Sequence, residues 1–147
     1  MWYVIGLIVI AAIAVPLWIR LAPSDPAVWH VTITDETHAV PGPCASHVRT
    51  LRNGARATCL LAEDPSTVLA KLDAIARATP RTAQLAATDG LTTWITRSRL
   101  MGFPDYTTAQ LRQTAQGTRL DVFARQRFGK NDLGVNTARL RTWLAGL

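Results

Sequence analysis

The side chains of this chain that could do chemistry are concentrated in its C-terminal part, and most of them are arginines. Residues 91–147 hold nine basic and three acidic side chains, whereas residues 1–90 hold seven of each, so the net charge of +6 comes from the C-terminal part. Arginine outnumbers lysine fourteen to two. Because a guanidinium group binds carboxylates and phosphates bidentately, this composition favours ion pairs or an anion site.

The arginines lie close in sequence to two aspartates, and together they form a candidate site. Its members are Arg97, Arg99, Asp105, Arg125, Arg127, Asp132, Asn136 and Arg139. In one interpretation, which we favour, Asp105 and Asp132 each bridge arginines and fix the loop before the last helix. In a second interpretation, two or more arginines bind a phosphate or a carboxylate. In a third, the two aspartates act as a catalytic carboxylate pair.

No sequence motif supports catalysis or metal binding. The chain has neither a glycine-rich phosphate loop nor a nucleophile elbow, so we expect a protein that is not an enzyme. Its three histidines are scattered and its two cysteines lack the spacing of metal ligands, so we expect no metal site and no cofactor. Cys44 and Cys59 form a disulfide in an oxidising compartment or remain two small apolar residues in a reducing one, and the sequence leaves both alternatives open.

The N-terminal stretch predicts a membrane-spanning helix. Residues 2–19 are apolar, the first charged side chain is Arg20, and aromatic residues stand at both ends of the stretch. The small residues at 12–14 resemble the cleavage site of a signal peptide, but the apolar run continues beyond them. We therefore expect an uncleaved anchor over residues 1–22. Arg20 favours a cytoplasmic domain under the positive-inside rule, although large domains translocate largely regardless of charge.

The remaining residues predict two helices and several strands. The dipeptide Asp64-Pro65 opens a helix that ends before Pro80, and Asn136 is expected to cap the last helix. Apolar residues of that last helix, Leu140 among them, are expected to pack inward. Residues 21–26 predict a semi-stiff spacer because they contain two X-Pro steps. Strands are expected at residues 28–33, 81–87, 91–101, 106–111 and 119–128.

These elements predict the α+β class. The expected architecture is an N-terminal transmembrane helix followed by a small domain, residues 23–147, with an antiparallel β-sheet covered by two helices. Along the last strand, residues 120, 122 and 124 are apolar and face one side. Residues 119, 121, 123, 125 and 127 face the other side, so the arginines of this strand lie on the side away from the apolar residues.

Several short motifs resemble one protein family. They are Arg97-Ser98, Gly102-Phe103-Pro104-Asp105-Tyr106, Arg125-x-Arg127-x-Gly129, Asp132-Leu-Gly-Val-Asn136, Arg139 and Trp143. Together they resemble the core pattern of the bacterial and plastid family known as domain of unknown function 1499 (DUF1499), over roughly residues 25–147. Members of that family are bacterial envelope proteins or lie in the thylakoid lumen. The resemblance therefore implies an extracytoplasmic domain, which outweighs the orientation that Arg20 favours.

The sequence and the resemblance lead to one functional expectation. We expect a non-catalytic membrane-anchored envelope protein of the bacterial inner membrane, with its domain in the periplasm. It would serve as a protein-interaction module or an accessory subunit of a membrane complex, with a membrane protein as its partner. The alternative is a binder of an anionic lipid or a small acidic ligand through the arginines. Nucleic acid is not expected, because the arginines lie in strands and no aromatic platform accompanies them.

Overall fold

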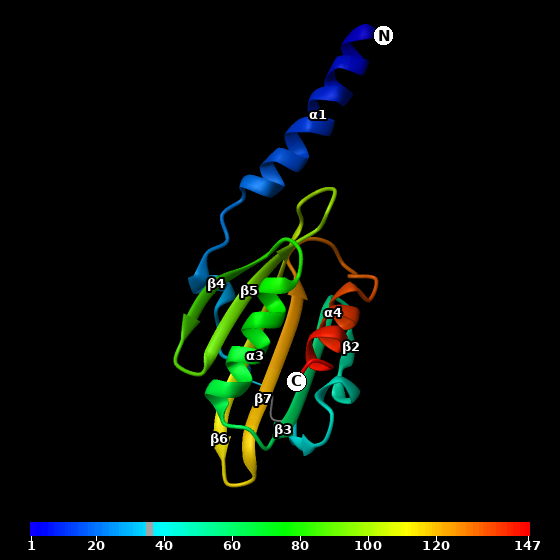
Figure 1. The fold of residues 1–147 in the computed structure, drawn as a ribbon. Coiled ribbons are helices and arrows are strands. Elements are labelled where there is room, and N and C mark those ends of the chain that lie inside the picture. Colours follow the sequence, from blue (N-terminus) through cyan, green and yellow to red (C-terminus); the bar gives the residue numbers. More distant parts are fainter. Residues whose placement is uncertain (35–36) are drawn as a thin grey trace.

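The computed structural model describes residues 1–34 and 37–147, and it consists of a long N-terminal helix and a small α+β domain (Figure 1). The helices are α1 (Trp2–Leu21), α2 (Pro26–Trp29), the 3₁₀ helix η1 (Cys44–His47), α3 (Pro65–Ala78) and α4 (Val135–Leu144). The strands are β1 (Val40–Pro41), β2 (Arg49–Leu51), β3 (Gly54–Leu61), β4 (Thr82–Thr88), β5 (Leu91–Arg97), β6 (Pro104–Thr114) and β7 (Gly117–Gln126).

The strands form one sheet in the order β1-β3-β7-β6-β5-β4, with β2 also paired to β3. Strands β4 to β7 follow one another as an antiparallel meander, and β3 joins its edge by pairing antiparallel to β7. The short strand β1 runs parallel to β3. The sheet is therefore mixed, and the prediction of a purely antiparallel sheet was wrong at this edge.

Helices α3 and α4 lie on the same face of the sheet, which we call the helix-covered face (Figure 1). On this face β7 presents Leu120, Val122 and Ala124, all of them buried, as the alternation of the strand predicted. The indole rings of Trp94 in β5 and Trp143 in α4 meet edge to face, with their centroids 5.8 Å apart. The core of the domain therefore lies between this face and the two helices.

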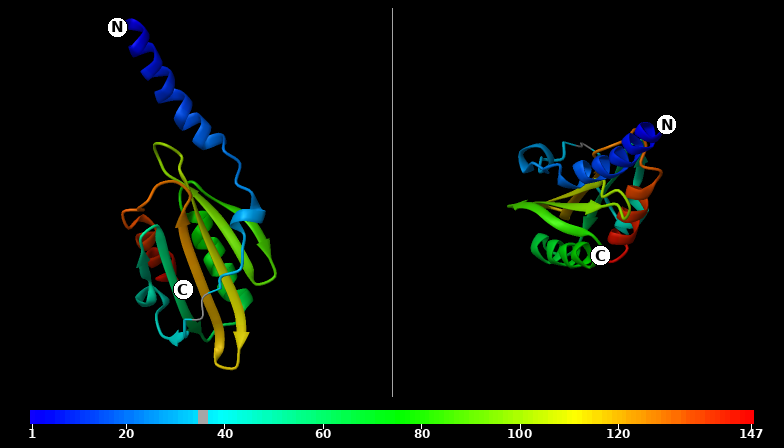
Figure 2. Two further views of the ribbon diagram at one scale, coloured as in Figure 1. Left: turned by 180° about the vertical axis from the view of Figure 1, so that it is seen from behind. Right: turned by 90° about the horizontal axis from the view of Figure 1, so that it is seen from above.

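The opposite face, which we call the polar face, is covered by residues 22–34, the connecting segment (Figure 2, left). The connecting segment leaves α1 and runs across β5, β6 and β7 through contacts described below. The two helices therefore cover one face of the sheet only. Residues 21–26, predicted as a semi-stiff spacer, bind to the polar face: Tyr106 forms a hydrogen bond with Ser24, and Arg127 donates to the carbonyl oxygen of Pro23.

The structure differs from the predicted strands in three further places. Residues 28–33 form no strand: Asp25 caps the helical turn α2 by accepting a hydrogen bond from the N–H of Ala27, and the chain continues without strand structure. The long strand β3 was missed, because the residues that it buries, Ala55, Ala57 and Cys59, are small and alanine has a low strand propensity. Strand β5 ends at Arg97, so Arg99 lies in the β5–β6 loop instead of in a strand.

The prediction of α3 is confirmed. The carboxylate of Asp64 accepts hydrogen bonds from the N–H and the hydroxyl of Thr67, and Pro65 occupies the first helical position. Hydrogen bonds from Ser66 and Thr67 hold the pKa of Asp64 below its ordinary value. The polar side of α3 is not simply solvated, because the indole N–H of Trp94 donates to Asp73 at 2.9 Å and ties the helix to β5.

Cys44 and Cys59 form a disulfide that joins η1 to β3, with their Cα atoms 5.4 Å apart. Both residues are buried in the core. The bond closes a loop with a sequence separation of 15 at the edge of the sheet. Of the two alternatives that the sequence left open, the structure adopts the disulfide.

Replacing both cysteines by alanine is expected to lower the free energy of unfolding by about 3 kcal/mol, because the unfolded chain then loses its closed loop. Urea unfolding of the two proteins under oxidising conditions measures the difference. A reducing agent should lower the stability of the wild-type protein and leave the alanine variant unchanged. Equal stability of the two oxidised proteins would contradict a stabilising disulfide.

Helix α1 is the one helix among the described residues that is long and apolar enough to cross a membrane. Its 20 residues span about 30 Å at 1.5 Å per residue, which matches the apolar thickness of a bilayer. Most of its side chains are exposed, as expected for a helix without a protein partner along its length. A membrane anchor and a signal sequence both have these properties.

Candidate functional site

The predicted site residues do not form one cluster; they separate into three groups. The first lies between the sheet and α4 and contains Asp105, Asp132, Asn136 and Arg139. The second, Arg125 and Arg127, lies beneath the connecting segment. The third, Arg97 and Arg99, belongs to the end of β5 and the loop that follows it.

In the first group, Asp105 of β6 forms an ion pair with Arg139 of α4. The Nη2 of Arg139 donates to Asp105 at 3.0 Å. The side chain of Arg139 is only 11% exposed and that of Asp105 only 15%. The Nη1 of Arg139 donates to the side-chain oxygen of Asn136, which is fully buried. Burial raises the pKa of Asp105, and the opposing effect of Arg139 does not fully offset it. The pair therefore fastens the last helix to the sheet.

Asp132 has a different role from the predicted one. Its two carboxylate oxygens accept hydrogen bonds from the N–H groups of Gly134, at 3.0 Å, and Asn136, at 3.1 Å. It therefore satisfies N–H groups at the start of α4, where Gly134 is the N-cap residue with a φ of 80°. The prediction that Asn136 caps this helix was wrong, because Asn136 lies inside it. The prediction that Asp132 bridges arginines was also wrong, since both of its oxygens bind the backbone.

Arg125 binds the connecting segment. Its Nη2 donates to the carbonyl oxygen of Trp29 at 2.6 Å, and its Nη1 lies 3.3 Å from the hydroxyl of Thr108. The guanidinium group also lies over the rings of Trp29 and Phe123, at 5.4 and 4.9 Å from their centroids. Burial lowers the pKa of Arg125, and the charge of Arg56 adds to this effect. The positive charge of this buried guanidinium group is therefore stabilised by the carbonyl oxygen of Trp29 and by the aromatic faces of Trp29 and Phe123.

The indole of Trp29 lies flat against the ring of Tyr106, with centroids 4.0 Å apart and an angle of 11° between the planes. The hydroxyl of the same Tyr106 forms a hydrogen bond of 2.7 Å with Ser24. Arg127 donates to the carbonyl oxygen of Pro23 at 2.8 Å. Three side chains of the polar face, Tyr106, Arg125 and Arg127, therefore hold the first half of the connecting segment.

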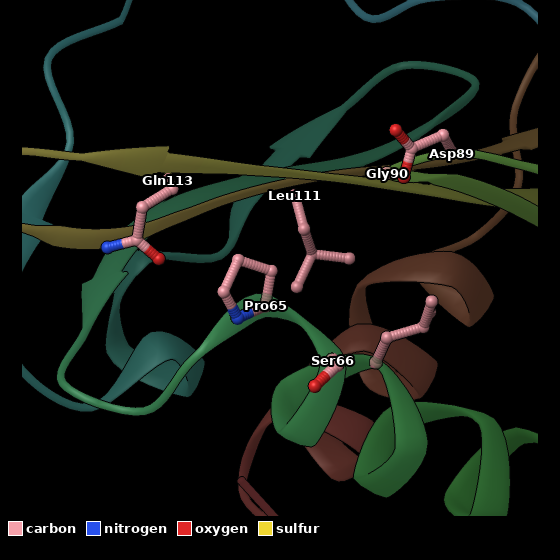
Figure 3. A pocket seen from close by; sticks show the side chains of 7 residues that line it. Pro65, Ser66, Asp89, Gly90, Leu111 and Gln113 are labelled. Carbon is pink, nitrogen blue, oxygen red and sulfur yellow. The ribbon is translucent and has the colours of Figure 1, made fainter.

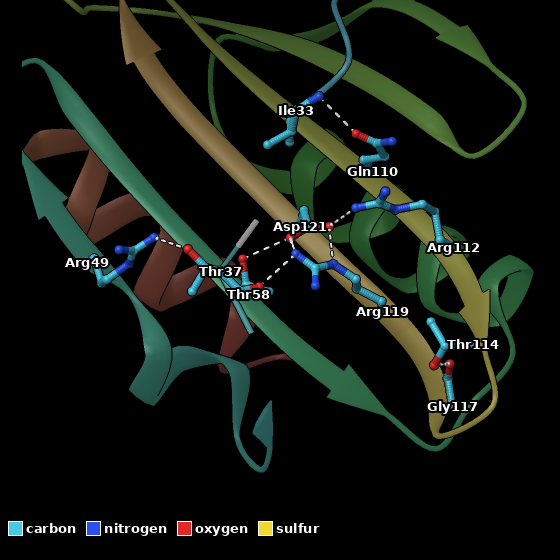
Figure 4. Close-up of polar contacts among 10 residues, drawn as sticks. All are labelled: Ile33, Thr37, Arg49, Thr58, Gln110, Arg112, Thr114, Gly117, Arg119 and Asp121. Atoms are coloured by element: carbon cyan, nitrogen blue, oxygen red, sulfur yellow. Dashed lines mark hydrogen bonds and ion pairs between the residues drawn. The ribbon is translucent and has the colours of Figure 1, made fainter. Parts of the chain in front are cut away.

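The second half of the connecting segment is held by uncharged side chains. The two ring nitrogens of His30 lie 3.0 Å from the hydroxyls of Thr93 and Thr88. The N–H of Ile33 donates to the side-chain carbonyl of Gln110 at 2.8 Å (Figure 4). These contacts extend across β4, β5 and β6, so the segment is bound along its length.

In the third group, Arg97 binds within the domain and Arg99 is exposed. The Nη1 of Arg97 donates to the carbonyl oxygen of Gly102 at 3.0 Å and so closes the β5–β6 loop. Arg99 is exposed in that loop. Arg97, Arg125 and Arg127 thus each donate to a main-chain carbonyl, and none of the three shares an ion pair with Asp105 or Asp132.

A buried ionic cluster on the polar face was not among the predicted site residues. Asp121 of β7 is 1% exposed and accepts hydrogen bonds from Thr58, Arg112 and Arg119 (Figure 4). The Nη2 of Arg119 also donates to the carbonyl oxygen of Thr37, beyond the connecting segment. The alternation of polar residues along β7, combined with the register to β6, is the sequence signal that could have identified this cluster.

A pocket of about 400 Å³ lies away from all these groups, between the start of α3 and the β4–β5 turn (Figure 3). It is lined by Pro65, Ser66, Leu69, Asp89, Gly90, Leu111 and Gln113. The lining contains no cationic side chain to bind an anion and no histidine to act as a base. The hydroxyl of Ser66 donates to the helix-capping carboxylate of Asp64. The pocket therefore contains neither predicted site residues nor a paired nucleophile and base.

The fold and these contacts define a class of protein: a small α+β domain that binds its own N-terminal segment across the polar face of its sheet. The chain belongs to the DUF1499 family of proteins of unknown function, whose family model matches residues 26–147. The match begins at the first residue of α2 and so includes the part of the connecting segment that contacts Tyr106 and Arg125. No curated protein matches the chain.

Proposed function

We propose that this protein is a non-catalytic, membrane-anchored envelope protein that serves as an interaction module or an accessory subunit of a membrane complex. The observation that carries the proposal is the binding of the connecting segment to the polar face of the sheet. A domain on a flexible tether samples many orientations, whereas this domain is fixed to the end of α1. A fixed orientation at the membrane suits a protein that presents a surface to a neighbouring membrane protein.

Contacts join the last turn of α1 to the domain. Trp18 meets Phe128 edge to face at 6.0 Å, and Arg20 donates to the carbonyl oxygen of Leu100 at 2.6 Å. Ile19 is only 4% exposed. Cleavage at residues 12–14 would leave these side chains on the domain, so the uncleaved anchor that we propose rests on the apolar run that continues beyond that site.

The location that we propose is the bacterial inner membrane, with the domain in the periplasm. The disulfide between Cys44 and Cys59 supports an oxidising compartment. Arg20 at the end of α1 favours a cytoplasmic domain under the positive-inside rule, but large domains translocate largely regardless of charge.

An anion-binding function through the predicted arginines receives less support. Arg97, Arg125 and Arg127 already donate to carbonyl oxygens of the chain, and Arg139 is paired with Asp105. A ligand phosphate would have to displace these internal acceptors. A function as an interaction module requires no such displacement, so we prefer it to anion binding.

Purification of the tagged full-length protein from native membranes in mild detergent, followed by native mass spectrometry, tests the proposal. The expected result is a complex of defined stoichiometry that contains a second protein chain. The control is the Trp29→Ala variant, which keeps α1 but weakens the fixed orientation and should recover less of that partner. A monomer that carries no second chain would overturn the interaction function, and a monomer with bound anionic lipid would favour the alternative.

A further inference from the structure

The β5–β6 loop, residues 98–103, lies at the end of the domain from which α1 projects (Figure 1; Figure 2, left). Leu100 at its tip is 82% exposed, although leucine is among the residues most often buried. The neighbouring Arg99 is exposed as well. Nothing else in the domain covers this leucine, so its exposure calls for an explanation outside the domain.

The loop is held in shape by its own hydrogen bonds. The N–H of Gly102 donates to the carbonyl oxygen of Ser98 at 3.2 Å, and the N–H of Phe103 donates to the Ser98 hydroxyl at 2.9 Å. Gly102 has a φ of 73°, a conformation that glycine adopts without strain. The guanidinium of Arg97 closes the loop from inside. Leu100 therefore cannot turn inward without breaking these bonds.

The loop is also joined to the last turn of α1. Arg20 donates to the carbonyl oxygen of Leu100 at 2.6 Å, and its side chain lies directly against Gly102. If α1 crosses the bilayer, its 20 residues fill the apolar thickness of about 30 Å and Arg20 lies at the headgroups. A loop in contact with Arg20 then lies at the same depth.

The side chains around this contact are those that favour a membrane interface. Trp18 packs against Phe128, and Phe128 packs against Phe103, with ring centroids 6.0 and 5.9 Å apart. Aromatic rings are enriched at the headgroup level of membranes. Arg20 and Arg99 place two cations beside them, and basic side chains at this level are attracted to anionic lipids.

We infer that the β5–β6 loop inserts Leu100 into the interface of the same bilayer leaflet that α1 enters, with the exposed Arg99 binding the phosphates of anionic lipids. The loop and α1 then form two attachments of the domain to one membrane surface. This inference rests on the proposed function, because it requires α1 to span the membrane.

Spin labels on the full-length protein test the inference. Both native cysteines are in the disulfide, so a single added cysteine is the site of labelling. The variants are Leu100→Cys in the loop, Ile10→Cys in α1 and Gln116→Cys in the β6–β7 turn at the other end of the domain. Each is reconstituted into vesicles of equimolar phosphatidylcholine and phosphatidylglycerol, and the accessibility of the label to oxygen and to a water-soluble nickel chelate is measured.

The expected result is that the labels at positions 100 and 10 are relaxed more by oxygen and the label at 116 more by the nickel chelate. A label at 100 that behaves like the one at 116, while the label at 10 lies in the lipid, overturns this inference alone. A label at 10 that is exposed to water overturns the anchor and with it the proposed function. A label at 100 shielded from both reagents indicates a protein contact and also overturns the inference.

A second arm tests the lipid headgroup. In vesicles of phosphatidylcholine alone, the oxygen preference of the label at position 100 should fall, and adding Arg99→Gln to Leu100→Cys should abolish this dependence on the lipid. The matched control is Arg141→Gln in place of Arg99→Gln, because Arg141 is an exposed arginine on α4. Equal labelling depth in the two lipids would overturn the role of Arg99 in binding anionic headgroups.

Discussion

Replacing Arg139 by methionine is expected to lower the free energy of unfolding by about 3–5 kcal/mol at neutral pH, because it leaves the buried carboxylate of Asp105 without its partner. Methionine retains most of the apolar stem of arginine, so the change removes the charge and the hydrogen bonds more than the packing. The buried oxygen of Asn136 also loses its donor. Urea unfolding of the wild-type protein and the variant measures the difference.

The size of this loss should depend on pH. Burial holds the pKa of Asp105 above its ordinary value, so the folded protein binds this proton more tightly than the unfolded chain. Protonation of Asp105 therefore favours folding as the pH falls through the folded pKa, and this gain is complete below the unfolded pKa. Since Arg139 acts to lower that pKa, its removal should raise it further. The destabilisation is thus expected to be largest at neutral pH and to shrink as the pH falls.

Arg141 provides the matched control, since it stands on the same helix but is exposed. The Arg141→Met variant should change stability by less than about 0.5 kcal/mol at any pH. If the two variants lost the same stability, the ion pair between Asp105 and Arg139 would not fasten α4 to the sheet. A loss at Arg139 that did not vary with pH would show that Asp105 is not the group left unpaired.

Replacing Trp29 by alanine is expected to release the connecting segment from the sheet. The change removes the stacking on Tyr106 and one of the two aromatic faces beside Arg125. The free energy that favours the bound segment over the released segment should fall by about 2–3 kcal/mol, which is less than the loss expected for a fully buried tryptophan. The N–H of Ile33 reports on this state, because it donates to Gln110 across the interface. Its hydrogen exchange should become about 30- to 150-fold faster.

The neighbouring Val28 supplies the control for this experiment. It belongs to the same helical turn but is 58% exposed. The Val28→Ala variant should leave the exchange of Ile33 unchanged, and amides of β6 and β7 should exchange at wild-type rates in both variants. Unchanged exchange at Ile33 in the Trp29→Ala variant would contradict a segment held by Trp29, and with it the fixed orientation of the domain.

The amino-acid sequence by itself determined the elements whose signals are local. Asp64 and Pro65 predicted the start of α3, because a helix N-terminus needs an acceptor for its N–H groups and tolerates proline there. The alternation along β7 predicted which residues face the core, since a strand turns successive side chains to opposite faces. The apolar run of residues 2–19 predicted α1, and the motifs around Asp105 and Asp132 were sufficient to identify the family.

Only the tertiary structure decided what the polar residues bind. The sequence shows that Arg125 and Asp132 are present, but it does not show their partners. Arg125 donates to a main-chain carbonyl oxygen, and Asp132 accepts from main-chain N–H groups. Every residue other than proline carries both a carbonyl oxygen and an N–H group. A main-chain partner leaves no trace in residue type, so the sequence favoured pairing the arginines with the aspartates. Strand β3 was missed for a related reason: alanine has a low strand propensity, and the pairing of β3 with β7 comes from distant parts of the chain. Local preference specifies which element a residue joins, whereas long-range packing selects its partner.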